Sequence, residues 1–115
     1  MKISEVSSAL SALAHEKRLE IFRLLVKRGP DGFAAGVIAE KLGLPAATLY
    51  FHIKELDRAG LVGARQDGRY IHYSANFAAM RALVGFLTDH CCSLAEDTCT
   101  PDCLPVAQPV RRKRA

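Results

Sequence analysis

Four cysteines near the carboxyl end are the residues of this sequence best suited to chemistry. They are Cys91, Cys92, Cys99 and Cys103. A thiolate is both a nucleophile and a soft metal ligand, and where thiols are kept reduced such a cluster favours metal or redox chemistry over structural disulfides. Elsewhere, no serine, cysteine or carboxylate stands in a recognisable nucleophile or acid–base motif, and there is no glycine-rich phosphate loop. We therefore expect a protein that is not an enzyme.

The length and composition predict a single domain with its own core. The chain has 115 residues, half of them hydrophobic, and a single domain typically has about 100 to 200 residues. No apolar run approaches the roughly 18 to 20 residues that cross a bilayer, and the first residues lack the basic-then-apolar order of a signal peptide. We expect a cytoplasmic protein without membrane contacts.

The charge is concentrated at one end of the chain. Sixteen Lys and Arg stand against 12 Asp and Glu, for a formal charge of +4. Four of these bases are Arg111, Arg112, Lys113 and Arg114, so the remainder is formally neutral. Any nucleic-acid binding must then depend on locally placed basic side chains and on the shape of the protein. The basic end is either an extra phosphate contact of low specificity or a solvated, unfolded end.

Apolar residues at helical spacing predict four helices before residue 61. Their expected ranges are 3–13, 19–28, 32–42 and 45–60. Gly43 closes the third helix and Pro45 opens the fourth, so only a few residues separate them. Two short helices with a tight glycine-containing turn are typical of a helix-turn-helix.

The residues that follow predict a hairpin and one more helix. Segments 61–65 and 69–74 contain β-formers and are joined by Gln66-Asp67-Gly68, in which Asp-Gly is a strong turn signal. A helix-turn-helix followed by a hairpin indicates a winged arrangement. Asn76 is the expected N-cap of a last, long helix.

Both terminal helices carry apolar stripes that need a partner. The stripes consist of Ile3, Val6, Leu10 and Leu13 in the first helix and Phe77, Met80, Leu83, Val84 and Leu87 in the last. Pairing across a two-fold axis would bury both stripes, so we expect a homodimer. The predicted fold class is mostly α with a β-hairpin wing, a winged helix-turn-helix that dimerises through its first and last helices.

The fourth helix has two contrasting faces. Leu49, His52, Ile53 and Leu56 share the face expected to pack inward. The outward face and the hairpin supply the candidate DNA contacts, which are Ala47, Thr48, Tyr50, Phe51, Lys54, Arg58, Arg65, Gln66 and Arg69. In this interpretation hydroxyls meet bases or phosphates, Phe51 touches thymine methyls, and the basic side chains contact the DNA backbone and a minor groove. The alternatives are packing of the aromatic pair against a neighbouring loop and a hairpin tip without a partner.

Three segments resemble the ArsR/SmtB family of metalloregulatory repressors. They are residues 13–22 (LAHEKRLEIF), 38–44 (IAEKLGL) and 51–62 (FHIKELDRAGLV), followed by Asp67-Gly68-Arg69-Tyr70. The resemblance covers residues 5–90. It implies a winged helix-turn-helix homodimer that occupies double-stranded operator DNA until an inducer lowers its affinity. The expected division is a DNA-binding and dimerisation domain over 1–92 and a cysteine-containing tail with a basic end over 93–115.

The chain departs from the family pattern at three places. The start of its fourth helix lacks the small polar residues and the arginine that many members have there, so the operator cannot be inferred. Ala34-Ala35-Gly36 stand where many arsenic and cadmium sensors have Cys-x-Cys. Asp89 and His90 lack the second half of the zinc site that other members have on the last helix.

The cysteine cluster is the remaining candidate for the inducer site. Adjacent residues on a helix lie about 100° apart, so Cys91 and Cys92 could converge only at the helix flank, with Cys99 as a third thiolate. Three sulfurs suit trivalent arsenite or antimonite, and the pattern is similar to that of family members with cysteines at the carboxyl end. Cys103 would replace Cys99 or remain outside the site. Binding should order the tail.

Other interpretations of the cluster stay open. Zinc or cadmium would take all four sulfurs in a tetrahedron, although an adjacent pair does not match the usual ligand gap. A redox or persulfide sensor would pair Cys91 or Cys92 with Cys99 or Cys103 on oxidation. In a non-sensing winged-helix dimer, the cysteines would hold structural zinc.

Overall fold

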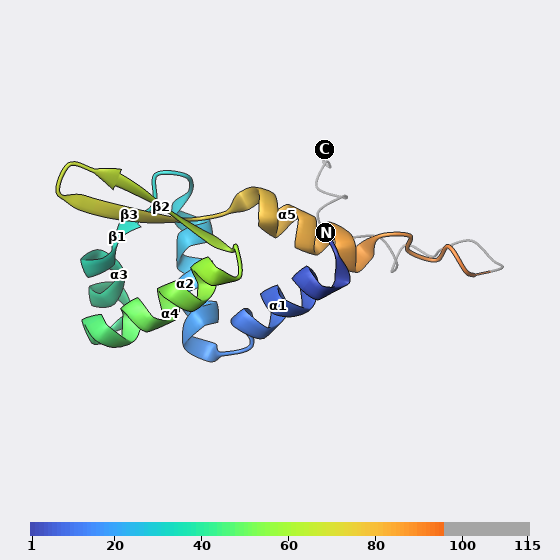
Figure 1. Ribbon diagram of the computed structural model, residues 1–115, viewed down its shortest axis with the longest axis horizontal. Helices are drawn as coiled ribbons and strands as arrows, with labels where there is room; N and C mark the ends of the chain where they lie inside the picture. Colours follow the sequence, from blue (N-terminus) through green and yellow to red (C-terminus); the bar gives the residue numbers. More distant parts are fainter. Residues whose placement is uncertain (96–115) are drawn as a thin grey trace, which may run out of the picture.

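The computed structural model describes residues 1–95, which form five helices and a small antiparallel sheet (Figure 1). The elements are α1 (Ile3–Leu13), α2 (Glu16–Arg28), β1 (Phe33–Ala34), α3 (Ala35–Leu42), α4 (Ala46–Arg58), β2 (Val62–Asp67), β3 (Tyr70–Ala75) and α5 (Phe77–Thr88). Figure 1 shows α1 and α5 at one end of the domain and α3, α4 and the hairpin at the other. Over residues 1–95, no helix is long and apolar enough to cross a membrane.

The core lies where α2, α3, α4 and the start of the hairpin meet. Its most fully buried large side chains are Ile21, Leu25, Ile38, Leu49, Ile53, Leu56 and Leu61. They recur at helical spacing within α2 and α4, so each of these helices turns one apolar face inward. The predicted inward face of α4 is confirmed, since all four of its residues are buried.

The turn between α3 and α4 follows the prediction. Gly43 ends α3 in the left-handed conformation, with φ of 66°, and the Leu44 amide donates to the Ala39 carbonyl at 3.0 Å. A glycine adopts this conformation without a Cβ penalty. Pro45 is then the N-cap of α4. The predicted helix-turn-helix is confirmed.

The sheet differs from the prediction in two ways. Residues 33–34, which the sequence predicts to be helical, form β1, and this strand pairs antiparallel with β3 so that Phe33 faces Tyr73. Gly32 makes this pairing possible, because a Cβ at that position would overlap the Tyr73 carbonyl oxygen. The hairpin also extends further than predicted, since β2 reaches Asp67 and pairs with Tyr70. The turn is therefore Gly68-Arg69 rather than 66–68.

The last helix begins as predicted and ends early. The Asn76 side chain accepts a hydrogen bond from the Ala79 amide at 3.1 Å and donates to the Gly60 carbonyl at 3.0 Å. Near the other end, the Thr88 hydroxyl donates to the Val84 carbonyl at 3.0 Å, and α5 stops there. The predicted placement of the adjacent cysteines on this helix is therefore wrong, because residues 89–95 lie beyond the helix, mostly in turns.

Candidate nucleic-acid interface and thiol pair

The outer face of α4 is exposed along its length. Its predicted contact residues Ala47, Thr48, Tyr50, Phe51, Lys54 and Arg58 are all exposed. Tyr50 and Phe51 show 51% and 56% of their surface, which is unusual for large aromatic side chains. No side chain caps the N-terminus of this helix, so its first amides remain available to an anion. The face is thus apolar at its centre and basic towards its end.

Phe51 is held in place by a residue of α2. The Arg18 guanidinium lies over the Phe51 ring, 5.6 Å from its centroid. The same guanidinium donates a hydrogen bond from Nε to Nδ1 of His52 at 3.2 Å. Arg18 therefore contacts two consecutive residues of α4, one on its outer face and one buried. This contact fixes the aromatic ring relative to the helix core.

Among residues 1–95, His52 is a buried polar residue of the core, and its surroundings favour the neutral imidazole. Its pKa lies below the ordinary value of 6.5, first because of burial and then because of the nearby charges of His15 and Arg18. The ring of His15 packs against it with centroids 4.7 Å apart. A neutral imidazole can accept the Arg18 hydrogen bond through its unprotonated nitrogen, whereas a protonated one cannot. The Arg18 contact consequently depends on pH.

Tyr50 lies on α4 and interacts with the hairpin. Burial, and next a side-chain hydrogen bond with Tyr50, raise the pKa of the Tyr73 phenol. Tyr73 lies in β3 and exposes 8% of its surface. Tyr50 is therefore close to the wing as well as exposed on the outer face of α4, where the sequence predicts a contact with bases.

Some of the predicted DNA contacts in and near the hairpin form hydrogen bonds or ion pairs within the protein. Arg65 donates from Nη2 to the Asp31 carbonyl at 3.2 Å, and Gln66 donates from Nε2 to the Gly68 carbonyl at 3.2 Å. Gln66 thus stabilises the wing itself, whereas Arg65 connects the wing to the loop between α2 and β1. Arg69 lies in the exposed turn, and Arg58 at the end of α4 forms an ion pair with Glu55 at 3.1 Å. Of the four predicted basic contacts, Lys54 and Arg69 are therefore the best placed to contact DNA.

Two of the predicted thiols lie side by side. The sulfur atoms of Cys91 and Cys92 are 3.6 Å apart. Turns after α5 bring them together: His90 and Cys92 take left-handed backbone angles, with φ of 58° and 64°, and the Ser93 amide donates to the His90 carbonyl at 3.0 Å. Left-handed angles are uncommon in residues other than glycine.

The described part of the chain supplies two sulfurs to this site. Cys99 and Cys103, the predicted third and fourth ligands, lie outside residues 1–95. Within that range, no three His, Cys, Asp or Glu side chains converge in a way that could hold a metal ion. Asp89 and His90, which precede the thiol pair, contact each other at 3.7 Å.

Known proteins place the chain in a family of regulators. Residues 13–62 match the model of a helix-turn-helix domain. Nodulation protein NolR of Rhizobium meliloti is 39% identical over 80 residues, which are 70% of this chain and 63% of NolR. An ArsR-like transcriptional regulator from a Rhodococcus species has a similar structure, with a TM-score of 0.66 and 30% identity over 73% of this chain and 76% of that one. The chain belongs to the ArsR family of transcriptional regulators.

The similarity to ArsR-family proteins is best supported for the helix-turn-helix and less so for the segment that contains the thiols. The homodimeric winged helix-turn-helix DNA-binding domain of Mb0332 from Mycobacterium bovis also resembles the chain, with a TM-score of 0.61 and 27% identity over 84% of this chain and 90% of that one. The predicted winged fold is confirmed, and so is the prediction that the chain is not an enzyme. The chain spans less than two thirds of NolR, and the matched helix-turn-helix segment ends before the cysteines.

Arg18 is a residue at the candidate interface of this ArsR-family chain that the sequence did not reveal. It lies next to a predicted helix, and its partner His52 is 34 residues away. The one available signal was a histidine on the predicted inward face of α4, because a buried imidazole needs a hydrogen-bond partner.

Proposed function

We propose that the chain is a dimeric transcriptional repressor that binds double-stranded operator DNA through α4 and the wing. The observation that carries this is the exposed face of α4, where two aromatic rings lie between an uncapped helix N-terminus and the basic residue Lys54. A helix of this kind fits the major groove of DNA, in which apolar contacts read thymine methyls and basic side chains contact phosphates. Membership of a helix-turn-helix regulator family supports the same role.

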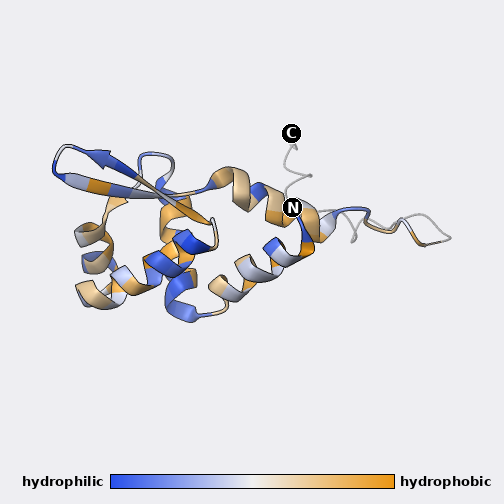
Figure 2. Ribbon diagram, in the orientation of Figure 1, coloured by the Kyte–Doolittle hydropathy of each residue, from blue (hydrophilic) through white to orange (hydrophobic). Residues whose placement is uncertain are grey.

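The proposed dimer forms through α1 and α5. Ile3 and Leu10 of α1 are 75% and 42% exposed, and Val84 and Leu87 of α5 are 49% and 59% exposed. Figure 2 shows α5 as hydrophobic along most of its length. Both α1 and α5 lie at the end of the domain opposite to α3 (Figure 1). The face of α4 that carries Tyr50, Phe51 and Lys54 is exposed, so a two-fold pairing through α1 and α5 leaves it open in both copies. Mb0332, a relative of the same fold, is a homodimer.

The proposed inducer is trivalent arsenite or antimonite bound by Cys91, Cys92 and Cys99. Two sulfurs that bind one ion at about 2.3 Å, with angles of about 90 to 110° between them, lie about 3.3 to 3.8 Å apart. The observed separation of 3.6 Å between the first two sulfurs therefore fits a shared ion. A pyramidal ion with three sulfur ligands would take its third ligand from the sequence beyond residue 95. Zinc or cadmium with all four thiolates is the second candidate, because the same separation also fits a tetrahedral ion.

The thiol pair can act on DNA binding through its position in the chain. It follows α5 after only a short turn, and α5 is part of the proposed dimer face. A ligand that orders these turns would change the packing of the dimer face. The distance between the two α4 helices of the dimer would then change, although it must match DNA half-sites about 34 Å apart. A coupling of about 1 to 3 kcal/mol is enough for a 5- to 150-fold change in affinity.

Substitutions can test DNA binding by α4 separately from release through the thiols. Lys54→Ala should weaken binding to DNA from upstream of the gene and reduce the salt dependence by about one phosphate contact per subunit, or about two per dimer. Lys2→Ala, which alters a lysine outside α4 and the wing, is the matched control and should bind as the wild type does. Equal affinity of all three proteins would exclude α4 as the reading helix.

The thiols are tested with the same DNA. Cys91→Ser and Cys92→Ser should each keep the wild-type affinity for DNA and lose release by arsenite, while Ser93→Ala should retain release. Full release from both cysteine variants would exclude the proposed site. Weak DNA binding by the cysteine variants without ligand would show a structural role instead.

A further inference from the structure

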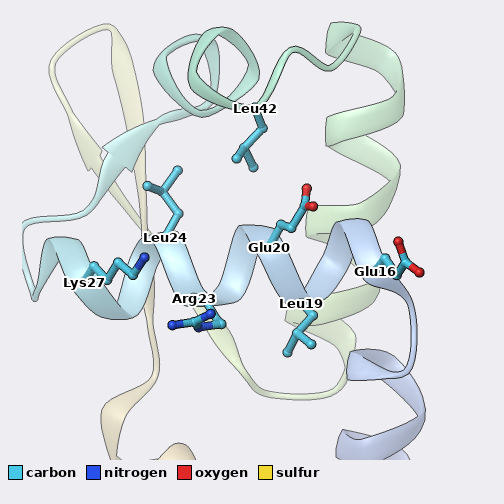
Figure 3. A pocket seen from close by; sticks show the side chains of 7 residues that line it. All are labelled: Glu16, Leu19, Glu20, Arg23, Leu24, Lys27 and Leu42. Atoms are coloured by element: carbon cyan, nitrogen blue, oxygen red, sulfur yellow. The ribbon is translucent and has the colours of Figure 1, made fainter.

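A hollow of about 390 Å³ lies against α2 near the end of α3, away from the residues of the proposed interface and thiol pair (Figure 3). It is lined by Glu16, Leu19, Glu20, Arg23, Leu24, Lys27 and Leu42. All but Leu42 belong to α2. Figure 3 shows the two carboxylates towards one end of the helix and the two basic side chains towards the other. The surface is therefore acidic at one end, apolar within and basic at the other end.

These side chains are arranged symmetrically about the centre of α2. The residues that lie equally far from the midpoint between residues 21 and 22 are Glu16 with Lys27, Leu19 with Leu24, and Glu20 with Arg23. When two identical helices pack antiparallel about a two-fold axis, residues equally far from the axis face one another. Each carboxylate would then face a basic residue of the second copy, and each leucine would face a leucine.

The charges on this face are only partly compensated within one copy of the chain, where Glu20 and Arg23 are opposite charges three residues apart. Glu16 and Glu20 are four residues apart, as are Arg23 and Lys27, and like charges at this spacing destabilise a helix. Among the ion pairs of residues 1–95, this set takes part in one, between Glu20 and Lys17 at 3.5 Å. Both of its side chains are about half exposed, and such pairs contribute little. A second copy would compensate charges of both signs at once.

We propose that this face of α2 is a self-association surface, on which a second copy of the chain packs with its α2 antiparallel. The surface is separate from the α1 and α5 face, so it would join dimers into tetramers. The apolar contact comes from Leu19, which is 44% exposed, with the half-buried Leu24. One helix face is smaller than the roughly 800 Å² per partner of a standard interface. The association is therefore weak in solution and strengthens where copies are held close together.

Charge reversal at the centre of α2 tests this arrangement without disturbing the helix ends. Glu20→Lys places two basic side chains opposite each other across the axis, and Arg23→Glu places two carboxylates opposite each other. Each variant should weaken self-association of the full chain by roughly tenfold to a hundredfold, because two attractive contacts per interface become repulsive. An equimolar mixture of the two variants restores opposite charges at both contacts. So does the double variant Glu20→Lys/Arg23→Glu.

Sedimentation velocity over a range of protein concentrations is the measurement. We expect a concentration-dependent doubling of mass for the wild type, the mixture, the double variant and the control Glu40→Lys, which alters a carboxylate of α3 outside the hollow. The two single variants should lack it, and 0.5 M salt should weaken it in the wild type. Recovery in the double variant would show that neither substitution unfolds the chain. A wild type of constant mass, single variants that associate normally, or a mixture that fails to recover would each overturn the proposal.

Discussion

The contact between Arg18 and His52 makes a prediction that can be worked out from the structure. Arg18→Met keeps most of the side chain's apolar stem and removes its charge and its hydrogen bond. The buried His52 Nδ1 then loses the donor that lies at 3.2 Å, and an unsatisfied buried acceptor costs about 1 to 3 kcal/mol. The lost guanidinium contact with Phe51, at 5.6 Å, adds about 0.5 to 1 kcal/mol. We expect the free energy of unfolding at pH 8 to fall by roughly 1.5 to 4 kcal/mol.

Urea unfolding at one fixed protein concentration measures this loss, because an associating chain has a concentration-dependent stability. A double-mutant cycle with His52→Leu then isolates the contact. The Arg18→Met substitution should be much less harmful in the His52→Leu background, with a coupling energy of about 1 to 3 kcal/mol. A coupling energy below about 0.3 kcal/mol, which is the usual error of additivity, would refute the assigned hydrogen bond.

Three further predictions concern the fold and the proposed dimer. The pKa of His52 is lowered from 6.5 in the folded chain, so the unfolded chain binds more protons as the pH drops below 6.5. The free energy of unfolding should therefore decrease as the pH is lowered through this range. His52→Leu should flatten this part of the pH profile measured by urea unfolding. Gly32→Ala should lower the free energy of unfolding by about 2 to 4 kcal/mol in thermal unfolding, since the φ of Gly32 is 71° and the new Cβ would overlap Tyr73. Gly36→Ala is the control and should not destabilise the chain, because a Cβ there meets nothing within 4 Å. Equal losses for the two variants would contradict the β1 pairing. Leu87→Glu on the exposed side of α5 should shift the chain from dimer to monomer in sedimentation equilibrium, and a persistent dimer would move the interface away from α5.

The sequence predicted the parts of the fold that depend on local periodicity. The inward face of α4 follows from the spacing of Leu49, Ile53 and Leu56, and the turn before it follows from Gly43. It did not predict β1, because residues 33–34 pair with a strand about 40 residues further along the chain. That pairing depends on the close approach of Gly32 to Tyr73, which no local pattern contains.

In the candidate sites too, features that depend on local periodicity could be predicted and contacts between distant residues could not. The exposure of Phe51 and Lys54 could be predicted from the helical period, whereas the Arg18 contact that orients Phe51 joins residues distant in sequence. The adjacency of Cys91 and Cys92 was evident, but their geometry was not. The expected helix ends before them, and the turns after Thr88, rather than a helical rotation of about 100°, determine the separation of the two sulfurs.

Fluorescence anisotropy of the reduced, full-length wild type on DNA from upstream of its gene tests the central claim most directly. The complex would be titrated in parallel with arsenite, antimonite, zinc and cadmium. The account predicts release by arsenite or antimonite at lower concentrations than by either divalent ion. Release by zinc or cadmium alone, or a complex that no thiophilic ion dissociates, would contradict it.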